Sequence, residues 1–196
     1  MSANALYGLV LAGGESRRMG RDKALLPRNG ESQLAYLAAL LGRLCDRVFV
    51  SARSTQQHDA ERSRFDLVVD HYQNLGPMAG ILSALEDYPD KDWLVVACDL
   101  PNVDEPTLRF LLEHRSAAKP FTAFRSSHDG LPEPLCAIYK NSSANVLRNF
   151  VAEGVICPRK VMMRSDSHLL EQPDPGALDN INTPDDLERS VLGAGS

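Results

Sequence analysis

The sequence predicts an α/β protein built in three layers, with helices on both faces of a mostly parallel, Rossmann-like sheet. Short apolar runs rich in Val, Leu, Ile and Phe recur along the chain, and segments with apolar residues at spacings of three and four lie between them. This alternation is the sequence pattern of βαβ units, which form a parallel sheet covered by helices. With 196 residues, 43% of them hydrophobic, the chain is long enough for a sizeable core. No repeat or low-complexity tract divides it, so we expect a single domain over residues 1–196.

Six apolar runs predict the strands, and four half-buried patterns predict the helices between them. The strands are expected at Leu6–Ala12, Arg47–Ala52, Leu67–Asp70, Trp93–Cys98, Phe121–Phe124 and Leu135–Tyr139. The helices are expected at Gln33–Leu44, Met78–Tyr88, Glu105–Glu113 and Ser142–Ala152. A last short helix is indicated by Thr183 as its N-cap and Pro184 at the first helical position.

Charge and composition exclude several classes of protein. Twenty-six acidic against 21 basic residues give a net charge of −5, the wrong sign for holding nucleic acid by neutralising its phosphates. The apolar runs are far shorter than the roughly 20 residues of a membrane span, and Met1–Asn4 lacks the basic and apolar regions of a signal peptide. We therefore expect a cytoplasmic protein without nucleic-acid or membrane partners. The four cysteines form no Cys-x-x-Cys pair and are interpreted as buried small hydrophobic residues.

The segment after the first predicted strand is a candidate phosphate-binding loop. In such a fold the ligand lies outside the carboxyl ends of the strands, so residues that follow strands are the first candidates for a site. Residues 11–23 read Leu-Ala-Gly-Gly-Glu-Ser-Arg-Arg-Met-Gly-Arg-Asp-Lys. Glycines at 13, 14 and 20 permit positive φ and close backbone approach, so that N–H groups can converge on a phosphate.

Basic residues are concentrated in this segment and directly after it. Five of the 21 in the chain fall within twelve residues: Arg17, Arg18, Arg21, Lys23 and Arg28. In an acidic protein this local excess indicates that a polyanion binds here. The spacing matches neither a Walker A loop nor the Rossmann dinucleotide fingerprint. A polar, glycine-containing turn with a solvated basic surface is the alternative interpretation.

A carboxylate lies at the end of one further predicted strand and directly after another. Asp70 precedes the element Gly76-Pro-Met-Ala-Gly80, in which Pro77 can open a helix. Gly80 lowers helix stability relative to alanine, which indicates close approach of a ligand or tight packing of helix on strand. Asp99 follows the most apolar strand and is a hard oxygen ligand suited to Mg²⁺, which takes only one or two protein carboxylates. The alternative for Asp99 is a turn residue ahead of Pro101.

These motifs resemble those of the molybdenum cofactor guanylyltransferases, a family of nucleotidyltransferases. The pattern Leu-Ala-Gly-Gly-x-Ser-x-Arg-Met-Gly-x-Asp-Lys-x-Leu-Leu is met at every fixed position from Leu11 to Leu26. The likeness runs from about residue 6 to residue 190 and includes the closing element Asn-x-Asn-Thr-Pro-x-Asp/Glu-Leu. It implies a fold of the nucleotide-diphospho-sugar transferase type, in which one strand of the mostly parallel sheet runs antiparallel.

The resemblance also implies roles for particular residues. The nucleotide-binding set is Leu11, Ala12, Gly13, Gly14, Arg18, Gly20, Lys23, Asp70, Gly76, Gly80 and Asp99. Of these, Arg18, Lys23 and Asp99 are implied to be catalytic, and Asp99 to bind the metal. Asn180 and Asn182 are implied contacts to a pterin substrate; Asn182 is alternatively a turn residue ahead of Thr183.

The implied reaction is transfer of GMP from GTP to molybdopterin or molybdenum cofactor, with Mg²⁺ as cofactor. Residues 5–100 would form the nucleotide half and 101–192 the pterin half, and a molybdenum-insertion protein or molybdoenzyme chaperone would be a partner. A transferase of the same fold that uses CTP, or another acceptor, is one alternative, and a nucleotide-binding regulator without turnover is another. Where the family often has asparagine after the second strand, this chain has Ser51-Ala52-Arg53, so no nucleotide contact is assigned to that loop.

Overall fold

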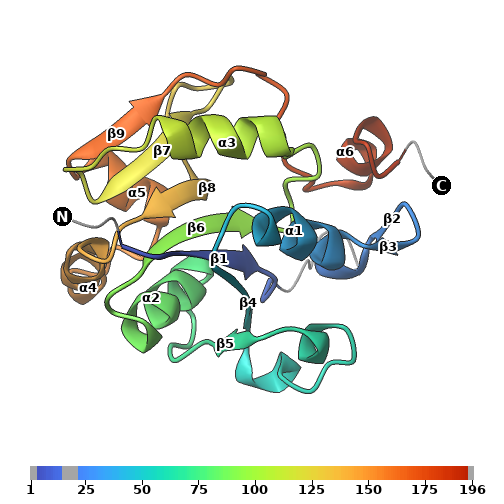
Figure 1. Ribbon diagram of the computed structural model, residues 1–196, viewed down its shortest axis with the longest axis horizontal. Helices are drawn as coiled ribbons and strands as arrows, with labels where there is room; N and C mark the ends of the chain where they lie inside the picture. The colour runs from blue at the N-terminus through green and yellow to red at the C-terminus, as the bar shows by residue number, and fades with distance from the viewer. Residues whose placement is uncertain (1–3, 15–21, 194–196) are drawn as a thin grey trace.

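The computed structural model describes residues 4–14 and 22–193 and contains a seven-stranded sheet with the order β5-β4-β1-β6-β8-β7-β9 (Figure 1). Four neighbouring strands run parallel: β5 (Leu67–Val69), β4 (Arg47–Ala52), β1 (Leu6–Leu11) and β6 (Asp92–Ala97). β8 (Pro132–Tyr139) runs antiparallel to both β6 and β7 (Phe121–Arg125), and β9 (Ser167–Leu170) pairs parallel with β7. The predicted mostly parallel sheet with an antiparallel strand is confirmed.

Helices cover both faces of this sheet, which confirms the three layers. On one face, α1 (Gln33–Gly42) and α3 (Glu105–Glu113) bury leucines such as Leu37 and Leu108. On the other, α2 (Pro77–Asp87), α4 (Ser143–Ala152) and α5 (Pro158–Met163) pack over Trp93. Burial of these apolar stripes against the sheet is the main favourable term that holds the layers together.

Helix starts follow the capping residues in the sequence. The Ser32 hydroxyl accepts a hydrogen bond from the Ala35 N–H at 3.0 Å, and the Asp104 carboxylate accepts one from the Thr107 N–H at 3.0 Å. These side chains satisfy backbone donors that the first turn of a helix leaves without an intrahelical partner. α1 and α3 therefore begin where the sequence supplies a polar cap.

Several elements differ from the sequence prediction. β8 begins at Pro132 rather than Leu135, because its first residues pair with β7 beyond a register shift between Ala123 and Arg125, where two prolines are tolerated. The short elements α5 and β9 were not predicted, since six and four residues are too few to show a clear period. The two-residue strands β2 (Pro27–Arg28) and β3 (Glu31–Ser32) form a small separate hairpin that was also not predicted.

The C-terminal segment of the chain packs against residues near its N-terminus. α6 (Pro184–Arg189) is capped by the Thr183 side chain, as predicted, and lies beside the β2–β3 hairpin (Figure 1). A small apolar cluster joins Leu26 to Ile181 and Leu192. Residues far apart in sequence thus meet near the carboxyl ends of β1 and β6.

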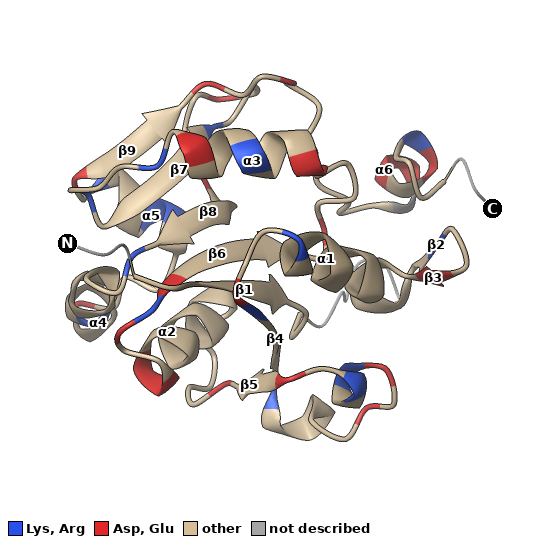
Figure 2. Ribbon diagram, in the orientation of Figure 1, with Lys and Arg blue, Asp and Glu red and all other residues tan. Residues whose placement is uncertain are grey.

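The charges are dispersed in the view of Figure 2, where acidic and basic residues alternate over helices and loops while the strands are mostly uncharged. Over the part of the chain that the structure describes, we find no helix of the length and apolarity that a membrane crossing requires. Three of the four cysteines are buried or partly buried, but Cys157 is exposed, contrary to its predicted burial, because it precedes the short helix α5 at the surface.

Candidate active site

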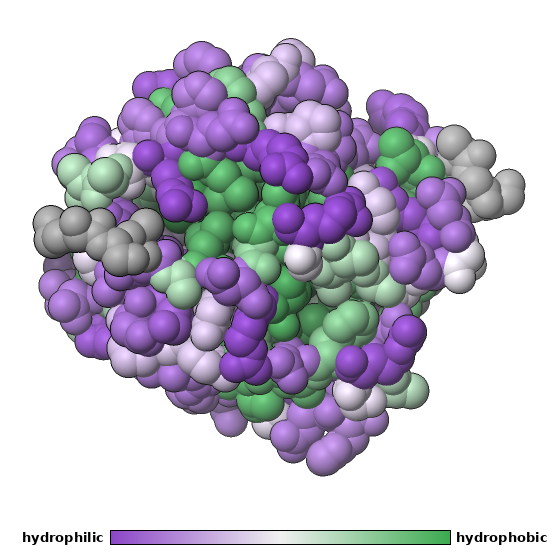
Figure 3. Space-filling view, in the orientation of Figure 1, coloured by the Kyte–Doolittle hydropathy of each residue, from purple (hydrophilic) through white to green (hydrophobic). Residues whose placement is uncertain are grey.

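A cavity of about 640 Å³ opens at the carboxyl ends of β1, β4, β5 and β6. The chain leaves β1 toward β4 on one side and reaches β6 on the other, so this edge contains the point at which the strand order reverses. Ligands of open α/β sheets bind at such a point. Figure 3 shows one face of the molecule, on which hydrophobic residues are visible in a hollow between hydrophilic ones.

Most of the predicted nucleotide-binding residues line this single cavity. The lining includes Leu11, Ala12, Gly13, Gly14, Lys23, Asp70, Gly76 and Asp99. Arg18 and Gly20 lie outside the described residues. The cavity therefore brings together residues that lie far apart in the sequence, from Leu11 to Leu135.

The two glycines after β1 leave space rather than supply an unusual conformation. Neither Gly13 nor Gly14 is among the positive-φ glycines of the described residues, so the expected freedom of φ is not used at these positions. A Cβ at Gly13 would lie 3.6 Å from Asp70 Oδ2, and a Cβ at Gly14 would meet nothing within 4 Å. Glycine here keeps the backbone accessible from the cavity. Gly76, by contrast, has φ of +56° at the start of α2, a conformation that favours glycine.

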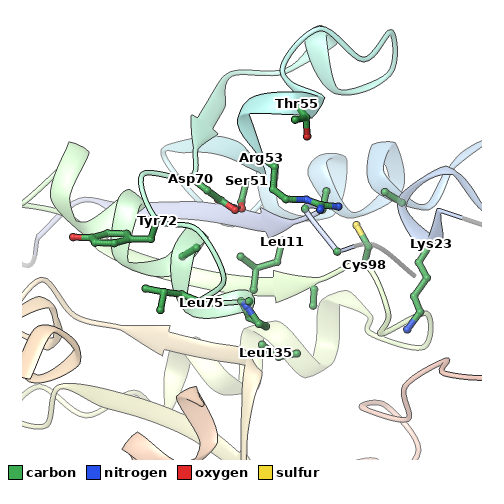
Figure 4. A pocket seen from close by; sticks show the side chains of 18 of the residues that line it. Leu11, Lys23, Ser51, Arg53, Thr55, Asp70, Tyr72, Leu75, Cys98 and Leu135 are labelled. Atoms are coloured by element: carbon green, nitrogen blue, oxygen red, sulfur yellow. Dashed lines mark hydrogen bonds between the residues drawn. The ribbon is translucent and has the colours of Figure 1, made fainter. Parts of the chain in front are cut away.

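Lys23 and Asp99 face each other at one side of the cavity. The Asp22 carboxylate accepts a hydrogen bond from the Ala24 N–H at 3.0 Å and so begins the short 3-10 turn Lys23–Leu25. That turn places Lys23 Nζ 3.8 Å from Asp99 Oδ2, with both side chains about four-fifths buried. Figure 4 shows Lys23 reaching into the cavity on the side opposite Tyr72.

The Asp99 carboxylate carries an unused acceptor. Its Oδ1 is buried and has no hydrogen-bond partner among the described residues. Burial raises the pKa of Asp99, and the Lys23 ammonium opposes this shift. No group of three or more His, Cys, Asp or Glu side chains suited to a metal occurs in residues 4–14 and 22–193. A single carboxylate with a free oxygen fits Mg²⁺ that takes its other ligands from phosphate and water, and does not fit a metal held entirely by protein.

The opposite side of the cavity is formed by Ser51, Arg53 and Asp70 (Figure 4). The Ser51 hydroxyl donates a hydrogen bond to Asp70 Oδ1 at 3.0 Å. Burial raises the pKa of the Asp70 carboxyl, while the Ser51 hydrogen bond and the Arg53 charge lower it in part. This side of the cavity is thus lined by both hydrogen-bond donors and hydrogen-bond acceptors.

Replacing Asp70 by asparagine is expected to remove a pH dependence of stability. The unfolded carboxyl ionises near pH 4. Because the folded pKa is higher, the folded state binds more protons above that pH, so the unfolding free energy of the native protein falls as pH rises through the folded pKa. Denaturant titrations between pH 4 and 7 should show D70N gaining stability relative to the native protein as pH rises. The exposed Asp66→Asn is the control, and parallel curves for D70N and the native protein would contradict the prediction.

Three of the predicted site residues, Gly80, Asn180 and Asn182, are absent from the cavity lining. Gly80 is absent from the cavity lining, and a Cβ at this position would lie 2.2 Å from Ser51 Oγ, so its position reflects tight packing of α2 on β4. Asn180 and Asn182 are exposed. Asn182 Oδ1 nevertheless accepts a hydrogen bond from Lys23 Nζ at 3.2 Å, and the Ile181 N–H donates to the Asp99 carbonyl at 2.8 Å. The closing element therefore contacts both residues of the Lys23–Asp99 pair.

Sequence reasoning missed the contribution of the loop after β4. Ser51, Arg53, Ser54 and Thr55 all line the cavity, although no contact was assigned to them. Their position directly after a predicted parallel strand could have identified them as site residues. They were not assigned because this loop lacks the asparagine that is common in the family. Arg62, by contrast, is buried but does not directly follow a strand, so its position in the sequence does not identify it.

Comparison with known proteins places the chain among nucleotidyltransferases. A molybdenum cofactor biosynthesis bifunctional protein of Synechocystis is 36% identical over 186 residues, which cover 95% of this chain and 54% of that protein. A probable molybdenum cofactor guanylyltransferase of Mycobacterium avium is 31% identical over 93% of both chains. The crystal structure of molybdopterin-guanine dinucleotide biosynthesis protein A from Archaeoglobus fulgidus superposes with a TM-score of 0.79 at 25% identity, over 96% of this chain and 98% of that one.

The mixed sheet and the cavity at its switch point define an α/β protein of the nucleotidyltransferase class. The match to a single family spans residues 8–168. The chain belongs to the MobA-like NTP transferase domain family.

Proposed function

We propose that this protein transfers GMP from GTP to the terminal phosphate of molybdopterin, or of its metal-loaded form, and releases pyrophosphate. Relatives that match most of the chain are named for guanylyl transfer to molybdenum cofactor. The observation that carries the proposal is the Lys23–Asp99 pair beside the backbone of Leu11–Gly14 in one cavity. A cation, a carboxylate and an accessible backbone are the groups that phosphate transfer requires.

The reaction asks little covalent chemistry of the chain. An oxygen of the acceptor phosphate forms a bond to the α-phosphorus of GTP, the bond from that phosphorus to the bridging oxygen breaks, and pyrophosphate leaves with the electron pair. The nucleophile is already an anion, so no side chain needs to take a proton from it. Lys23 stabilises the negative charge on the phosphate oxygens, and the residues along the cavity align the two substrates. Arg18, which lies outside the described residues, is proposed to share the charge-stabilising role of Lys23.

Asp99 is the residue proposed to hold Mg²⁺, through the buried Oδ1 that has no protein partner among the described residues. When bound, the ion would supply positive charge that stabilises the negative charge of the phosphates. The raised pKa of Asp99 follows from burial of its carboxylate, which the Lys23 ammonium offsets only in part, and a divalent ion would favour the charged form further.

We further propose that the two halves of the chain divide the substrates within a single nucleotidyltransferase domain. Residues 5–100 would bind the nucleotide, with Asp70 and Gly76 on the side of the base and ribose. Residues 101–192 would hold the pterin, with Asn180 and Asn182 near the Lys23 end of the cavity. Transfer of the product to a molybdenum-insertion protein or molybdoenzyme chaperone is proposed as the following step.

GTP is expected to bind in the presence of Mg²⁺ about 5- to 150-fold more tightly than ATP or CTP. The reason is that an unsatisfied buried polar group at the base side costs about 1–3 kcal/mol when the wrong base binds. Calorimetry with the three nucleotides tests selectivity, and release of pyrophosphate in the presence of molybdopterin tests turnover. Preference for CTP would assign the protein to a cytidylyl transfer, and tight GTP binding without pyrophosphate release would indicate a regulator.

A further inference from the structure

Arg62 is a fully buried arginine behind the glycine-rich segment, outside the cavity lining. It lies in the 3-10 turn η3 (Arg62–Arg64), between β4 and β5, and has 0% relative exposure. Its Nε and Nη2 donate to the Ala12 carbonyl at 3.2 and 2.6 Å, and Nη2 also donates to Asp22 Oδ2 at 2.6 Å. Asp59 Oδ1 lies 3.5 Å from Nη1. One guanidinium therefore contacts residues on both sides of segment 15–21.

A buried guanidinium is retained only if its charge and its donors are satisfied. Asp22 and Asp59 neutralise the Arg62 charge, so it adds little field to the cavity. Its contribution is geometric, since a planar fork can hold a carbonyl and a carboxylate in fixed relation at the same time. Lysine, with one rotatable ammonium, cannot reproduce this arrangement.

The bond to the Ala12 carbonyl determines where the next amide points. In a planar trans peptide the C=O of one residue and the N–H of the next point in opposite directions. The Gly13 N–H therefore points away from the Arg62 guanidinium, and Gly13 lines the cavity. No acceptor for this N–H occurs among residues 4–14 and 22–193. It is available to an oxygen anion in the cavity.

The hydrogen bond from Arg62 to Asp22 positions the residues that follow segment 15–21. Asp22 uses Oδ2 for Arg62 and Oδ1 to accept the Ala24 N–H, which begins the turn that carries Lys23. Fixing Asp22 therefore orients Lys23 toward Asp99, 3.8 Å away. Two groups suited to phosphate, the Gly13 amide and the Lys23 ammonium, depend on the same side chain.

We infer that Arg62 is a positioning residue for the triphosphate and pyrophosphate of the nucleotide. This inference rests on the proposed function, which identifies the ligand as a nucleoside triphosphate. Arg62 fixes Ala12 and Asp22 so that the Gly13 N–H and Lys23 meet the same anion.

The test uses Arg62→Lys in the full chain, with Arg64→Lys as the matched control. Arg64 is on the same turn, but its side chain is 63% exposed and pairs with Glu61. We expect R62K to weaken binding of inorganic pyrophosphate and of GTP at least 10-fold in calorimetry and to raise the KM for GTP while leaving the acceptor KM unchanged. In ¹⁵N–¹H spectra, pyrophosphate should shift the Gly13 amide of the native protein and of R64K, and this shift should be lost in R62K.

A purely structural role for Arg62 predicts a lowered melting temperature with native pyrophosphate affinity and a native Gly13 response below that temperature, and this result would overturn the inference. If R62K does not fold, Asp22→Asn tests the same contact from the other end. It should weaken pyrophosphate binding at least 3-fold, and native affinity would overturn the inference. Binding with a Gly13 response but without GMP transfer would disprove the proposed function while leaving the positioning role intact.

Discussion

Replacing Asp99 by asparagine is expected to lower kcat for GMP transfer by about 10²-fold or more without unfolding the protein. The change keeps the side-chain volume but removes the charge proposed to hold Mg²⁺. Since burial raises the pKa of Asp99, the native carboxylate is penalised at neutral pH, and D99N should have an equal or higher melting temperature. Steady-state kinetics across a Mg²⁺ titration, with thermal denaturation in parallel, measure both effects.

The matched control for D99N is Asp90→Asn. Asp90 precedes the opposite end of β6 and is an exposed residue paired with Lys91. Native turnover and native Mg²⁺ dependence are expected for this variant. If D99N itself keeps turnover within a few-fold of the native rate at limiting Mg²⁺, Asp99 is a structural turn residue and the metal assignment is wrong.

Replacing Lys23 by alanine is expected to lower kcat on the order of 10²-fold, the effect of removing one preorganised group that stabilises developing charge. Asn182→Ala provides a graded comparison, because it removes the acceptor 3.2 Å from Lys23 Nζ and leaves the ammonium in place. We expect N182A to lower kcat by roughly 2–10-fold, the effect of one hydrogen bond.

Kinetics at two ionic strengths distinguish a catalytic role of Lys23 from a role as a solvated surface charge. If the basic segment is only a solvated face, K23A will retain a near-native rate and change only its salt sensitivity. If Asn182 acts only on the pterin, N182A will raise the acceptor KM and leave kcat unchanged. The direct contact with Lys23 predicts that N182A lowers kcat in addition to any effect on the acceptor KM.

The sequence pattern predicted the central part of the fold because the strands there are strongly apolar. β1, β4 and β6 are buried on both faces and appear as continuous hydrophobic runs, within one residue of their predicted bounds. β9 is short and only partly buried along its whole length, so it lacks that signal. The early start of β8 was missed for a different reason. Pro132 and Pro134 argue against a strand, and only the register shift in its partner β7 permits one.

The candidate site was predictable where function requires a recognisable local motif. Leu11–Gly14, Lys23, Asp70 and Asp99 each follow a strand or lie in the loop that follows one, and the fold brings them to one edge. The support for these residues was not predictable. Arg62 belongs to no recognisable sequence motif, and its burial depends on Asp22 and Asp59, which the sequence alone does not pair with it. Asn182 could be identified as polar and turn-forming, but not as a partner of Lys23.

The hydrogen bond between Lys23 and Asn182 joins residues 159 positions apart, which has a consequence for the timing of synthesis. At about 5–20 residues per second, a ribosome adds Asn182 roughly 8–30 s after Lys23. During this interval the nascent chain can already contain the strands that surround the nucleotide cavity, but not the residues that contact Lys23 and the Asp99 carbonyl. The Lys23–Asp99 pair of a newly made molecule therefore gains these supporting contacts only after translation of the closing element, and ribosome-bound chains that stop before it have the cavity without this support.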